Sequence, residues 1–552
     1  MGAVSGGLMS FLHSLFAFFV ILVPLVVFHE FGHFLFAKIF GVKAEIFSVG
    51  FGPKLWSRQM GETEFRVSAI PLGGYVKLLG EDRESEISAA DLNRSLHRQK
   101  PWKRFLIFFG GPLFNFILAI FIFMAVLAIG EPQIASVVGR VVQGSYAEKV
   151  GFRSGDRILE IDGKPVKKFE EVLIALNDHP NQSLDFLVMH PDVVQPVHLK
   201  VTPSSQSGFS IYGESTPVGE IEGLFCSPRS PTAGVSNSNS TAARGGLSIG
   251  DKILKLDQIP IETWEQLEAL YGKLKAQTAF TLQFQNSKGK VSELPLVKPL
   301  HALGLEKDFG IFSSEMFVEK AVSRSPAEQA GLRAGDRLIG IGNLDVHGFF
   351  ELKDAVQRSG EKDGKVKVRW ERDGKIYHAE VIPTATAGRD PLLNKTVQYT
   401  VGIVPMLFYA EPVTFIEKIW NPFTLVRVAT ERMVTFSWRN LVSMKKMVTG
   451  DVSVGTLGGP LMIGKIAGES LARGLTVFLT NMAIFSIGLG VLNILPVPVL
   501  DGGHLMLLGV ESIRGKPLSL KQMEVVQGFG LVLILALMGI AFRNDLARLF
   551  YS

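Results

Sequence analysis

The chain alternates long apolar segments with stretches in which charged residues are frequent. Four apolar segments are long enough to cross the ~30 Å hydrocarbon core of a bilayer, which takes about 20 helical residues. They run over Leu8–Phe36, Phe105–Ile129, Leu475–Leu500 and Val525–Phe542, and the fourth, as the shortest, is also compatible with a buried helix of a soluble domain. Because 47% of the 552 residues are hydrophobic, the pattern predicts a polytopic α-helical membrane protein with four transmembrane helices.

A second pattern occurs three times between the second and third apolar segments. The sequences GFRSGDRILEIDGKPV, GLSIGDKILKLDQIPI and GLRAGDRLIGIGNLDV begin at Gly151, Gly246 and Gly331. In each copy a Gly-Asp pair precedes an alternating apolar strand, a turn and a helix-like stretch. The copies resemble bacterial, circularly permuted PDZ domains, which are α+β modules that bind an extended peptide as an added strand. The middle copy departs most and follows a Ser/Asn-rich stretch typical of a flexible linker, so a spacer or plug is its alternative role.

Two further segments have patterns of their own. Ala44–Gly80 alternates apolar and polar residues between glycine turns, which predicts a β element directly after the first span. Between Pro412 and Val448, aromatic and aliphatic residues are mixed with arginines and lysines. This composition suits an amphipathic helix lying on the membrane surface. It suits equally an ordinary helix packed beneath the PDZ-like modules.

These patterns divide the chain into consecutive regions. The first two spans occupy residues 1–37 and 105–129, and the last two occupy residues 475–500 and 522–543. The remaining regions are the loop with the β element at 38–104, the PDZ-like modules at 132–225, 226–310 and 311–405, and a juxtamembrane region at 410–474.

Basic residues are distributed unevenly around the spans. The loop between the first two spans is rich in lysine and arginine, whereas the N-terminal sequence MGAVSGGLMS contains neither. The positive-inside rule therefore places that loop in the cytoplasm and the PDZ-like modules outside it, and the N-terminal segment is a retained anchor rather than a signal peptide. Cys226 is the single cysteine, so no intrachain disulfide forms, which fits a bacterial periplasm. The small net charge of +5 favours a membrane over nucleic acid as partner.

The first span contains a polar motif where polar groups are costly. The sequence HEFGH runs from His29 to His33 and has the form H-E-x-x-H. On a helix the two histidines share a face and can reach one metal ion, with Glu30 placed as general base for the water that the metal activates. Such motifs recur by chance on soluble surface helices. Inside an apolar span the chance interpretation weakens, because buried polar groups there need partners.

Two histidines are too few for a catalytic zinc site, which usually has three protein ligands. The third span ends in NILPVPVLDGGHLM, where Asp501 is the first charged residue after a long uncharged run. Pro496 and Pro498 exclude a regular helix at this point. Asp501 is therefore the candidate third ligand, with an ordinary loop aspartate as the alternative and His504 as the weaker competing ligand.

Taken in order, the motifs resemble the site-two protease family of intramembrane zinc metalloproteases. The resemblance rests on HEFGH, on N-x-x-P-x-P-x-L-D-G beginning at Asn493, on GGPLFNF (Gly110–Phe116) in the second span, and on the PDZ-like modules between them. It covers the whole chain and is closest to the bacterial sigma-E-regulating branch of the family. The departure is the number of PDZ-like modules, since that branch has two and this chain has three.

The resemblance implies a role for each motif residue. His29, His33 and Asp501 would bind Zn²⁺, Glu30 would act as base, and Asn493 would position the substrate backbone or stabilise the developing oxyanion. No other cofactor is implied.

The function implied is cleavage of the transmembrane segment of a single-pass membrane protein, expected to be an anti-sigma factor already trimmed by another protease. The enzyme would lie in a bacterial inner membrane, with its active site near the cytoplasmic side and its PDZ modules in the periplasm, where they would filter substrates or capture peptide tails. A non-catalytic scaffold with a structural metal is the second hypothesis, but it leaves Glu30 without a task. A transporter with a metal site fits poorly with H-E-x-x-H.

Overall fold

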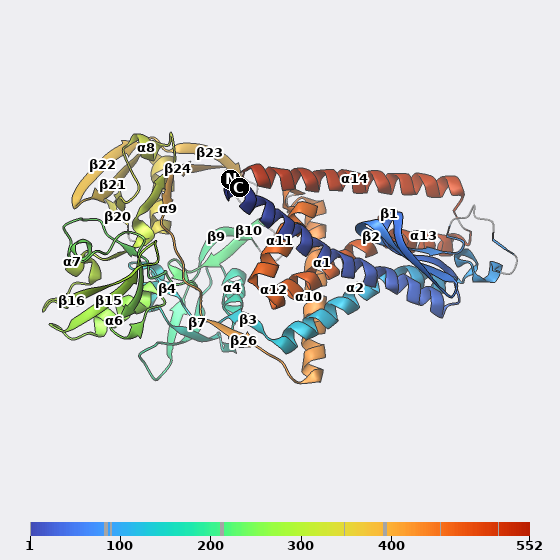
Figure 1. Cartoon of the computed structure of the whole chain (residues 1–552), viewed down its shortest axis with the longest axis horizontal. Helices are drawn as coiled ribbons and strands as arrows, with labels where there is room; N and C mark the ends of the chain where they lie inside the picture. Colours follow the sequence, from blue (N-terminus) through green and yellow to red (C-terminus); the bar gives the residue numbers. More distant parts are fainter. Residues whose placement is uncertain are drawn as a thin grey trace. The chain divides into compact units, whose positions relative to one another are not determined.

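The computed structural model describes residues 2–81, 87–88, 91–209, 215–346, 348–389, 395–452, 454–516 and 518–551. The chain divides into two compact units. Unit 1 contains the chain up to Pro132 and from Ile416 onward, and unit 2 contains the described residues between Gln133 and Phe415. Both units are drawn in Figure 1.

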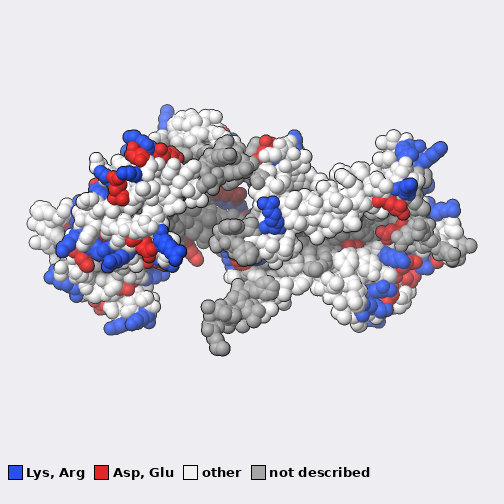
Figure 2. Space-filling view, turned by 90° about the horizontal axis from the view of Figure 1, so that it is seen from above, with Lys and Arg blue, Asp and Glu red and all other residues white. Residues whose placement is uncertain are grey.

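The four apolar segments are helices of unit 1, and each is long and apolar enough to cross a membrane. Their bounds are α1 (Gly2–Ile39), α2 (Pro101–Ile129), α12 (Leu475–Ile494) and α14 (Leu520–Tyr551). Helix α2 begins at a proline, whose missing N–H is not needed at a first helical position. Helix α12 ends before Pro496 and Pro498, as the sequence predicts. In Figure 2 the surface of the spans is largely free of charged residues, which gather instead near the hairpin end of unit 1.

Helices α1 and α2 approach each other at glycines. A Cβ atom on Gly32 would lie 2.1 Å from the carbonyl oxygen of Gly110, and a Cβ on Gly110 would lie 2.8 Å from the carbonyl oxygen of Gly32. Backbone therefore contacts backbone at this crossing. Small residues at helix crossings allow such approach in membranes, where van der Waals contact drives helix association.

The segment between the first two spans forms an antiparallel hairpin of β1 (Ala44–Met60) and β2 (Thr63–Leu78), so strands are present where Ala44–Gly80 predicts them. Residues 46–49 of β1 pair with residues 74–77 of β2 and also with residues 64–67, so the two long strands fold back within the hairpin. Phe34 of α1 packs edge-on against Phe47 and Phe65 of the two strands, with ring centroids 5.7 Å away in both cases. This aromatic cluster fixes the hairpin on the C-terminal half of α1 (Figure 1).

The juxtamembrane region contains α10 (Pro422–Thr449) and α11 (Pro460–Arg473), and a further helix, α13 (Asp501–Arg514), follows the third span. Ala429 and Phe436 of α10 pack in the same core cluster as α2 and α12, and Arg432 pairs with Glu131 at the end of α2 at 2.7 Å. One face of α10 is therefore packed along the spans. Trp438 lies on the other face and is 60% exposed.

Unit 2 contains three four-stranded sheets with the same strand order. The sheets are β6-β5-β7-β8, β14-β13-β15-β16 and β20-β19-β21-β22. Their strands are β5 (Arg157–Ile161), β6 (Lys164–Pro165), β7 (Leu184–Met189), β8 (Val197–Val201), β13 (Lys252–Leu256), β14 (Ile259–Pro260), β15 (Ala279–Gln285), β16 (Val291–Val297), β19 (Arg337–Ile341), β20 (Leu344–Asp345), β21 (Val366–Arg372) and β22 (Lys375–Val381). Each has its own hydrophobic core. We call the three parts of unit 2 that contain these sheets modules 1, 2 and 3, in chain order.

Each module also has one helix after its second strand and a short strand pair that joins its two ends. The helices are α4 (Phe169–Asp178), α6 (Trp264–Lys273) and α9 (Phe349–Asp363). The end pairs are β4 (Arg140–Val141) with β11 (Leu224–Phe225), β12 (Ala233–Gly234) with β17 (Phe312–Ser313), and β18 (Val318–Ala321) with β25 (Ile403–Pro405). Modules 1 and 3 each have an additional hairpin, formed by β9 (Ser204–Phe209) with β10 (Ser215–Glu220) and by β23 (Thr384–Arg389) with β24 (Lys395–Thr400). Module 2 has the short helix α7 (Leu305–Phe309) at the corresponding place.

The repeated Gly-Asp pair has a structural role. The carboxylates of Asp156, Asp251 and Asp336 each accept a hydrogen bond from the backbone N–H three residues earlier, at 2.7, 2.9 and 2.8 Å. Each aspartate thereby closes the loop that leads into the first strand of its sheet. Burial raises the pKa of the Asp156 and Asp251 carboxyls. The repeat is thus explained by folding, without a catalytic task.

The three modules are fastened to one another. Arg140 of module 1 pairs with Glu315, at the start of module 3, at 2.8 Å, and both side chains are buried. The expected flexible linker between modules 1 and 2 is held as well. Ser230 donates its N–H to Phe408 O at 2.8 Å, and Ala410 donates to Pro228 O at 2.9 Å. The start of the Ser/Asn-rich stretch is therefore fixed by the chain that leaves module 3, which corrects the expectation from composition.

The α1–α2 crossing predicts a position-dependent effect of added methyl groups. Gly32→Ala should lower the unfolding free energy by about 1–3 kcal/mol, because the methyl group collides with backbone that cannot move aside. Gly488→Ala in α12 is the matched control, since a Cβ there meets nothing within 4 Å. Thermal unfolding of the purified protein in detergent measures both. Equal stability of the two variants would contradict the close crossing.

The buried Arg140–Glu315 pair makes a second prediction. Arg140→Ala should destabilise unit 2 by about 3–5 kcal/mol, because it leaves a buried carboxylate without its cation. Lys365→Ala removes the exposed pair with Glu380 and should leave the unfolding transition unchanged. Calorimetric unfolding of both variants tests this. A shift for Lys365→Ala as large as that for Arg140→Ala would refute the assignment.

Candidate metal centre

The H-E-x-x-H motif lies in the last turns of α1 and its two imidazoles face each other. The Nε2 atoms of His29 and His33 are 3.2 Å apart, and the rings are edge-to-face with centroids separated by 4.9 Å. Four residues of separation on a helix produce this shared face. His29 is buried, directly after the uninterrupted apolar run from Leu15 to Phe28 of the same helix.

Asp501 completes a cluster with the two histidines. Its Oδ2 lies 3.1 Å from Nε2 of His29 and its Oδ1 lies 3.4 Å from Nε2 of His33. The three residues form a group that could hold a metal ion, in which all ligand atoms lie within 4.8 Å of one another. The sequence-predicted ligand set is therefore brought together from two distant segments.

The turn after α12 aims Asp501 at the histidines. Val499 has a φ of 84°, a conformation that costs a β-branched residue of order 1–3 kcal/mol. Gly502 and Gly503 then let helix α13 start directly against the turn, since Cβ atoms there would lie 2.1 Å from Leu495 O and 2.4 Å from Val497 O. The backbone is thus strained beside the cluster, and tight packing holds it there.

The residues of this cluster fit zinc. A tetrahedral zinc with bonds of about 2.0–2.1 Å has ligand atoms roughly 3.3 Å apart, and the two histidine Nε2 atoms, at 3.2 Å, agree with that edge length. Asp501 has one carboxylate oxygen beside each of these nitrogens, and a single oxygen together with both nitrogens lies within a 4.8 Å group. Gly111 of α2 also leaves room for an ion, because a Cβ there would lie 2.3 Å from Nε2 of His33 and 2.7 Å from Cε1 of His29. Two imidazoles and one carboxylate are a ligand set typical of catalytic zinc, with one position left for water.

Contacts behind the histidines orient the rings. His33 donates from Nδ1 to the carbonyl oxygen of Ile107 at 2.8 Å, which leaves the lone pair of Nε2 facing the cluster. Nδ1 of His29 lies 3.1 Å from the side-chain amide of Asn115, which is fully buried in α2. Both contacts come from α2, so the α1–α2 crossing sets the orientation of both rings.

The remaining candidate residues lie around the cluster. Glu30 faces the hairpin, since a Cβ on Gly74 of β2 would lie 3.1 Å from its Cγ. Asn493, in the last turn of α12, has its amide nitrogen 3.4 Å from Nε2 of His29. His504 stacks on Phe108 with centroids 4.7 Å apart, and the metal cluster found among the described residues includes Asp501 instead.

Sequence reasoning missed the part that α2 plays. Gly111 and Asn115 belong to the GGPLFNF motif, but no role was assigned to either. The available signal was that Asn115 is the single strongly polar side chain between Phe105 and Ile129. The contribution of Ile107 carries no signal, because a backbone carbonyl is present at every residue.

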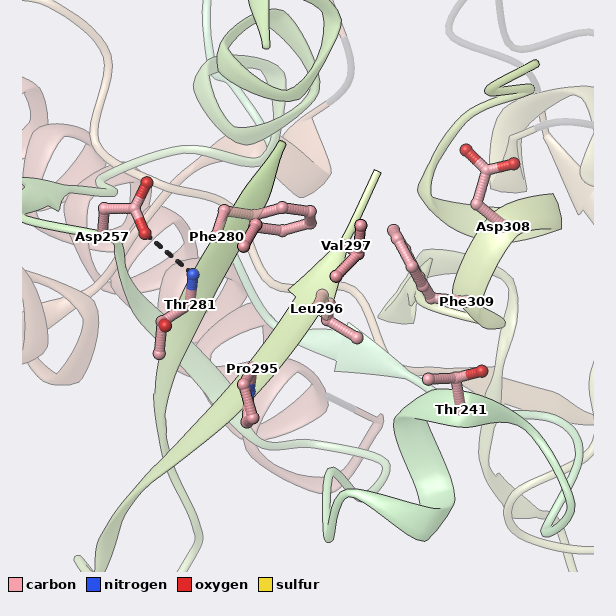
Figure 3. Close-up of a pocket in the computed structure, with 10 residues that line it drawn as sticks. Thr241, Asp257, Phe280, Thr281, Pro295, Leu296, Val297, Asp308 and Phe309 are labelled. Carbon is pink, nitrogen blue, oxygen red and sulfur yellow. Dashed lines mark hydrogen bonds between the residues drawn. The ribbon is translucent and has the colours of Figure 1, made fainter. Parts of the chain in front are cut away.

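A cavity of ≈ 490 Å³ in module 2 is a second concave site (Figure 3). It lies between β15, β16 and helix α7, and Phe280, Leu296 and Phe309 line it. The Asp257 carboxylate at its edge already accepts a hydrogen bond from the N–H of Thr281 at 2.8 Å. Asp308, the second carboxylate that lines it, accepts a hydrogen bond from the hydroxyl of Tyr271. Both carboxylates are therefore engaged in bonds of the module itself.

Comparison with known proteins agrees with this geometry. The model of Peptidase family M50 matches residues 17–537. A Neisseria meningitidis serogroup A protein, named as a candidate zinc metalloprotease, is 31% identical over 98% of this chain and 100% of its own length. The regulator of sigma-E protease RseP of Escherichia coli K12 is 28% identical over 98% of this chain and 100% of its own. A PDZ domain protein of Parabacteroides distasonis aligns with 49% of the chain and 100% of its own at 12% identity, but its TM-score of 0.12 carries no argument.

The comparisons confirm the predicted kinship and the predicted zinc dependence, because the matched family and the named relatives are metalloproteases. The match spans both halves of the metal cluster, since it includes α1 from its middle onward and the whole of α13. The chain therefore belongs to Peptidase family M50 and is a zinc-dependent metalloprotease of the regulator of sigma-E protease type.

Proposed function

We propose that this metalloprotease cleaves the transmembrane segment of single-pass membrane proteins inside the bilayer. The observation that carries the proposal is the cluster of His29, His33 and Asp501, with Glu30 beside it, among helices apolar enough to cross a membrane. Ionisable residues at such a depth mark functional sites. A substrate that reaches this cluster must itself lie in the membrane.

Each residue of the site would have a separate role in peptide-bond hydrolysis. His29, His33 and Asp501 hold the zinc, which supplies the Lewis acidity that activates water and polarises a carbonyl. Glu30 takes the proton from the attacking water and delivers it to the leaving amine nitrogen. The amide of Asn493, beside His29, donates a hydrogen bond to the substrate carbonyl oxygen as negative charge develops on it. A structural metal is disfavoured, because structural zinc sites are usually closed by four protein ligands.

The hairpin would present the substrate in a cleavable form. Peptide bonds inside a helix are shielded, so the scissile segment has to be extended before attack. Strand β2 passes beside Glu30 at Gly74, and its edge would pair with an extended segment by strand addition. Residues 74–78 of β2 pair with residues 44–49 of β1 and have no second strand partner among the described residues, which supports a free edge at this place.

The relatives and the charge distribution support a substrate and a placement in the cell. Regulators of sigma-E protease are named among them, which supports an anti-sigma factor trimmed by an earlier protease as substrate. The basic loop between α1 and α2 supports a cytoplasmic position for the active-site end and an extracytoplasmic position for unit 2 in a bacterial inner membrane.

Modules 1 to 3 would act as a PDZ-type size filter. Two contacts within unit 2 support a filter over a peptide-capturing tether. Gln357 of α9 donates to Val397 O at 2.8 Å and accepts from the N–H of Tyr399 at 3.0 Å, so the helix occupies backbone groups of β24 with which a peptide would pair. The buried Arg140–Glu315 pair joins the modules into one body, and a fixed body excludes bulky substrates better than modules on free linkers do.

The catalytic roles make a separable prediction. Glu30→Gln should reduce cleavage of a model transmembrane substrate by about 10²–10⁴-fold, because the base is lost, while zinc content stays at the level of the unmodified protein. Asp501→Ala should lose both zinc and activity. Metal analysis and a cleavage assay on each purified variant measure this, with Glu431→Gln on the exposed face of α10 as control. Full zinc and activity in Asp501→Ala would make His504 the third-ligand candidate instead.

The filter makes a prediction about substrate range. Removing unit 2 between Gln133 and Phe415 should allow cleavage of an untrimmed substrate that the complete chain refuses, because the excluding bulk is gone. A tether would instead predict slower cleavage of the trimmed substrate. Both substrates are compared with a zinc-loaded, folded deletion variant. Continued refusal of the untrimmed substrate would exclude the filter.

A further inference from the structure

Asn115 is a buried polar side chain with an unusual hydrogen-bond deficit. It lies in α2 with 0% of its surface exposed, and its Oδ1 has no hydrogen-bond partner among the described residues. Its backbone carbonyl accepts a hydrogen bond from Ser486 of α12 at 2.7 Å, so the residue is held in place from a second helix. A buried amide oxygen without a hydrogen-bond partner destabilises the fold, because it has lost its contacts with water. Such a group in a well-packed core is expected to have a partner in the functional state.

The neighbouring histidine offers one ring nitrogen, which can face either the oxygen or the nitrogen of this amide. The amide nitrogen of Asn115 lies 3.1 Å from Nδ1 of His29. The two ends of an amide are nearly the same size, so half a turn about the last side-chain bond exchanges them without new contacts. Oδ1 then lies within hydrogen-bond distance of Nδ1 of His29.

Metal binding by His29 requires the orientation in which the amide oxygen of Asn115, and not its nitrogen, faces the histidine ring. A neutral imidazole carries one proton, and a histidine that binds a metal through Nε2 carries it on Nδ1, where an acceptor must receive it. His33 has the carbonyl oxygen of Ile107 for this purpose, at 2.8 Å. For His29 the side-chain amide of Asn115 is the group in that position. With the amide nitrogen against Nδ1, the proton of His29 would instead sit on Nε2, which faces the other ligands.

We propose that Asn115 is a positioning residue of the metal centre, whose amide oxygen accepts the Nδ1–H of His29 and thereby holds the tautomer that binds metal through Nε2. This inference rests on the proposed ligand role of His29. The two histidines differ in one respect: the acceptor for His33 is backbone and survives any substitution, whereas the acceptor for His29 is a side chain. Affinity for zinc therefore depends on the residue at position 115.

Three substitutions test the proposal on the full-length protein in detergent. Asn115→Leu keeps the branched shape of the side chain and removes the acceptor, and Asn115→Asp keeps an acceptor oxygen. Ser470→Ala is the matched control, because it removes a buried hydroxyl that bonds within its own helix α11 at 2.9 Å. Zinc affinity is measured by competition with a chelator, and the absorption spectrum of the cobalt-substituted protein reports ligand geometry independently of activity.

Asn115→Leu should weaken zinc binding by about 10–100-fold and change the cobalt spectrum, as expected for loss of a group that orients a ligand. Asn115→Asp and Ser470→Ala should bind zinc within a few-fold of the unmodified protein. Thermal unfolding of the metal-free Asn115→Leu variant should remain cooperative, with its midpoint lowered by about a few degrees at most, because one buried hydrogen bond to His29 is lost. Loss of metal affinity with unchanged folding separates positioning from a purely structural role.

His29→Ala separates failure of this inference from failure of the ligand assignment. If His29→Ala loses zinc while Asn115→Leu retains full affinity, Asn115 does not position the ligand. Equal losses in Asn115→Leu and Asn115→Asp would also overturn the proposal, because an acceptor would then make no difference. Retention of zinc by His29→Ala would instead show that the ligand set itself is wrong.

Discussion

The contact on which the rest of unit 1 depends is the backbone-to-backbone crossing of α1 and α2 at Gly32 and Gly110. At this distance the carbonyl oxygen of Ile107 reaches His33, the Asn115 amide reaches His29, and Gly111 leaves open the space in front of both rings. A side chain at the crossing would push the helices apart and remove these contacts together. In a bilayer, where apolar burial gives little drive for association, such close packing is also what holds the two helices together.

The crossing explains how the apolar spans accept a polar cluster. Each histidine has one ring nitrogen directed to a partner on α2 and the other to the carboxylate of Asp501, so no imidazole nitrogen faces lipid alone. The carboxylate is delivered from the opposite end of the sequence by a turn that places Val499 in a left-handed conformation. The strain is held by Gly502 and Gly503, which allow α13 to pack against the turn without side chains between. Local strain and close packing are therefore two parts of one arrangement.

Unit 2 is held together differently, by contacts between three similar modules. Three modules contain sheets of identical strand order, and in each module a separate short strand pair joins the two ends of the chain segment. A buried ion pair between Arg140 and Glu315, together with the backbone bonds that join Pro228 and Ser230 to the chain leaving module 3, removes the freedom that a tandem array would otherwise have. The Gly-Asp repeat serves this construction, because its aspartates close loops inside each module.

The sequence by itself determined the apolar spans, the three repeats and the residue types of the candidate metal cluster, because these depend on short-range properties: apolar length, periodicity, and the four-residue spacing of His29 and His33 on one helical face. It also determined the end of α12, since Pro496 and Pro498 cannot continue a helix. Only the tertiary structure decided the contribution of α2, the fixed linker after module 1, and the orientation of Asp501. These features consist of contacts between residues far apart in the chain. Some of the contacts are made by backbone carbonyls, and others are possible only because a glycine has no side chain. A local sequence pattern does not indicate which distant segment will pack against such a glycine.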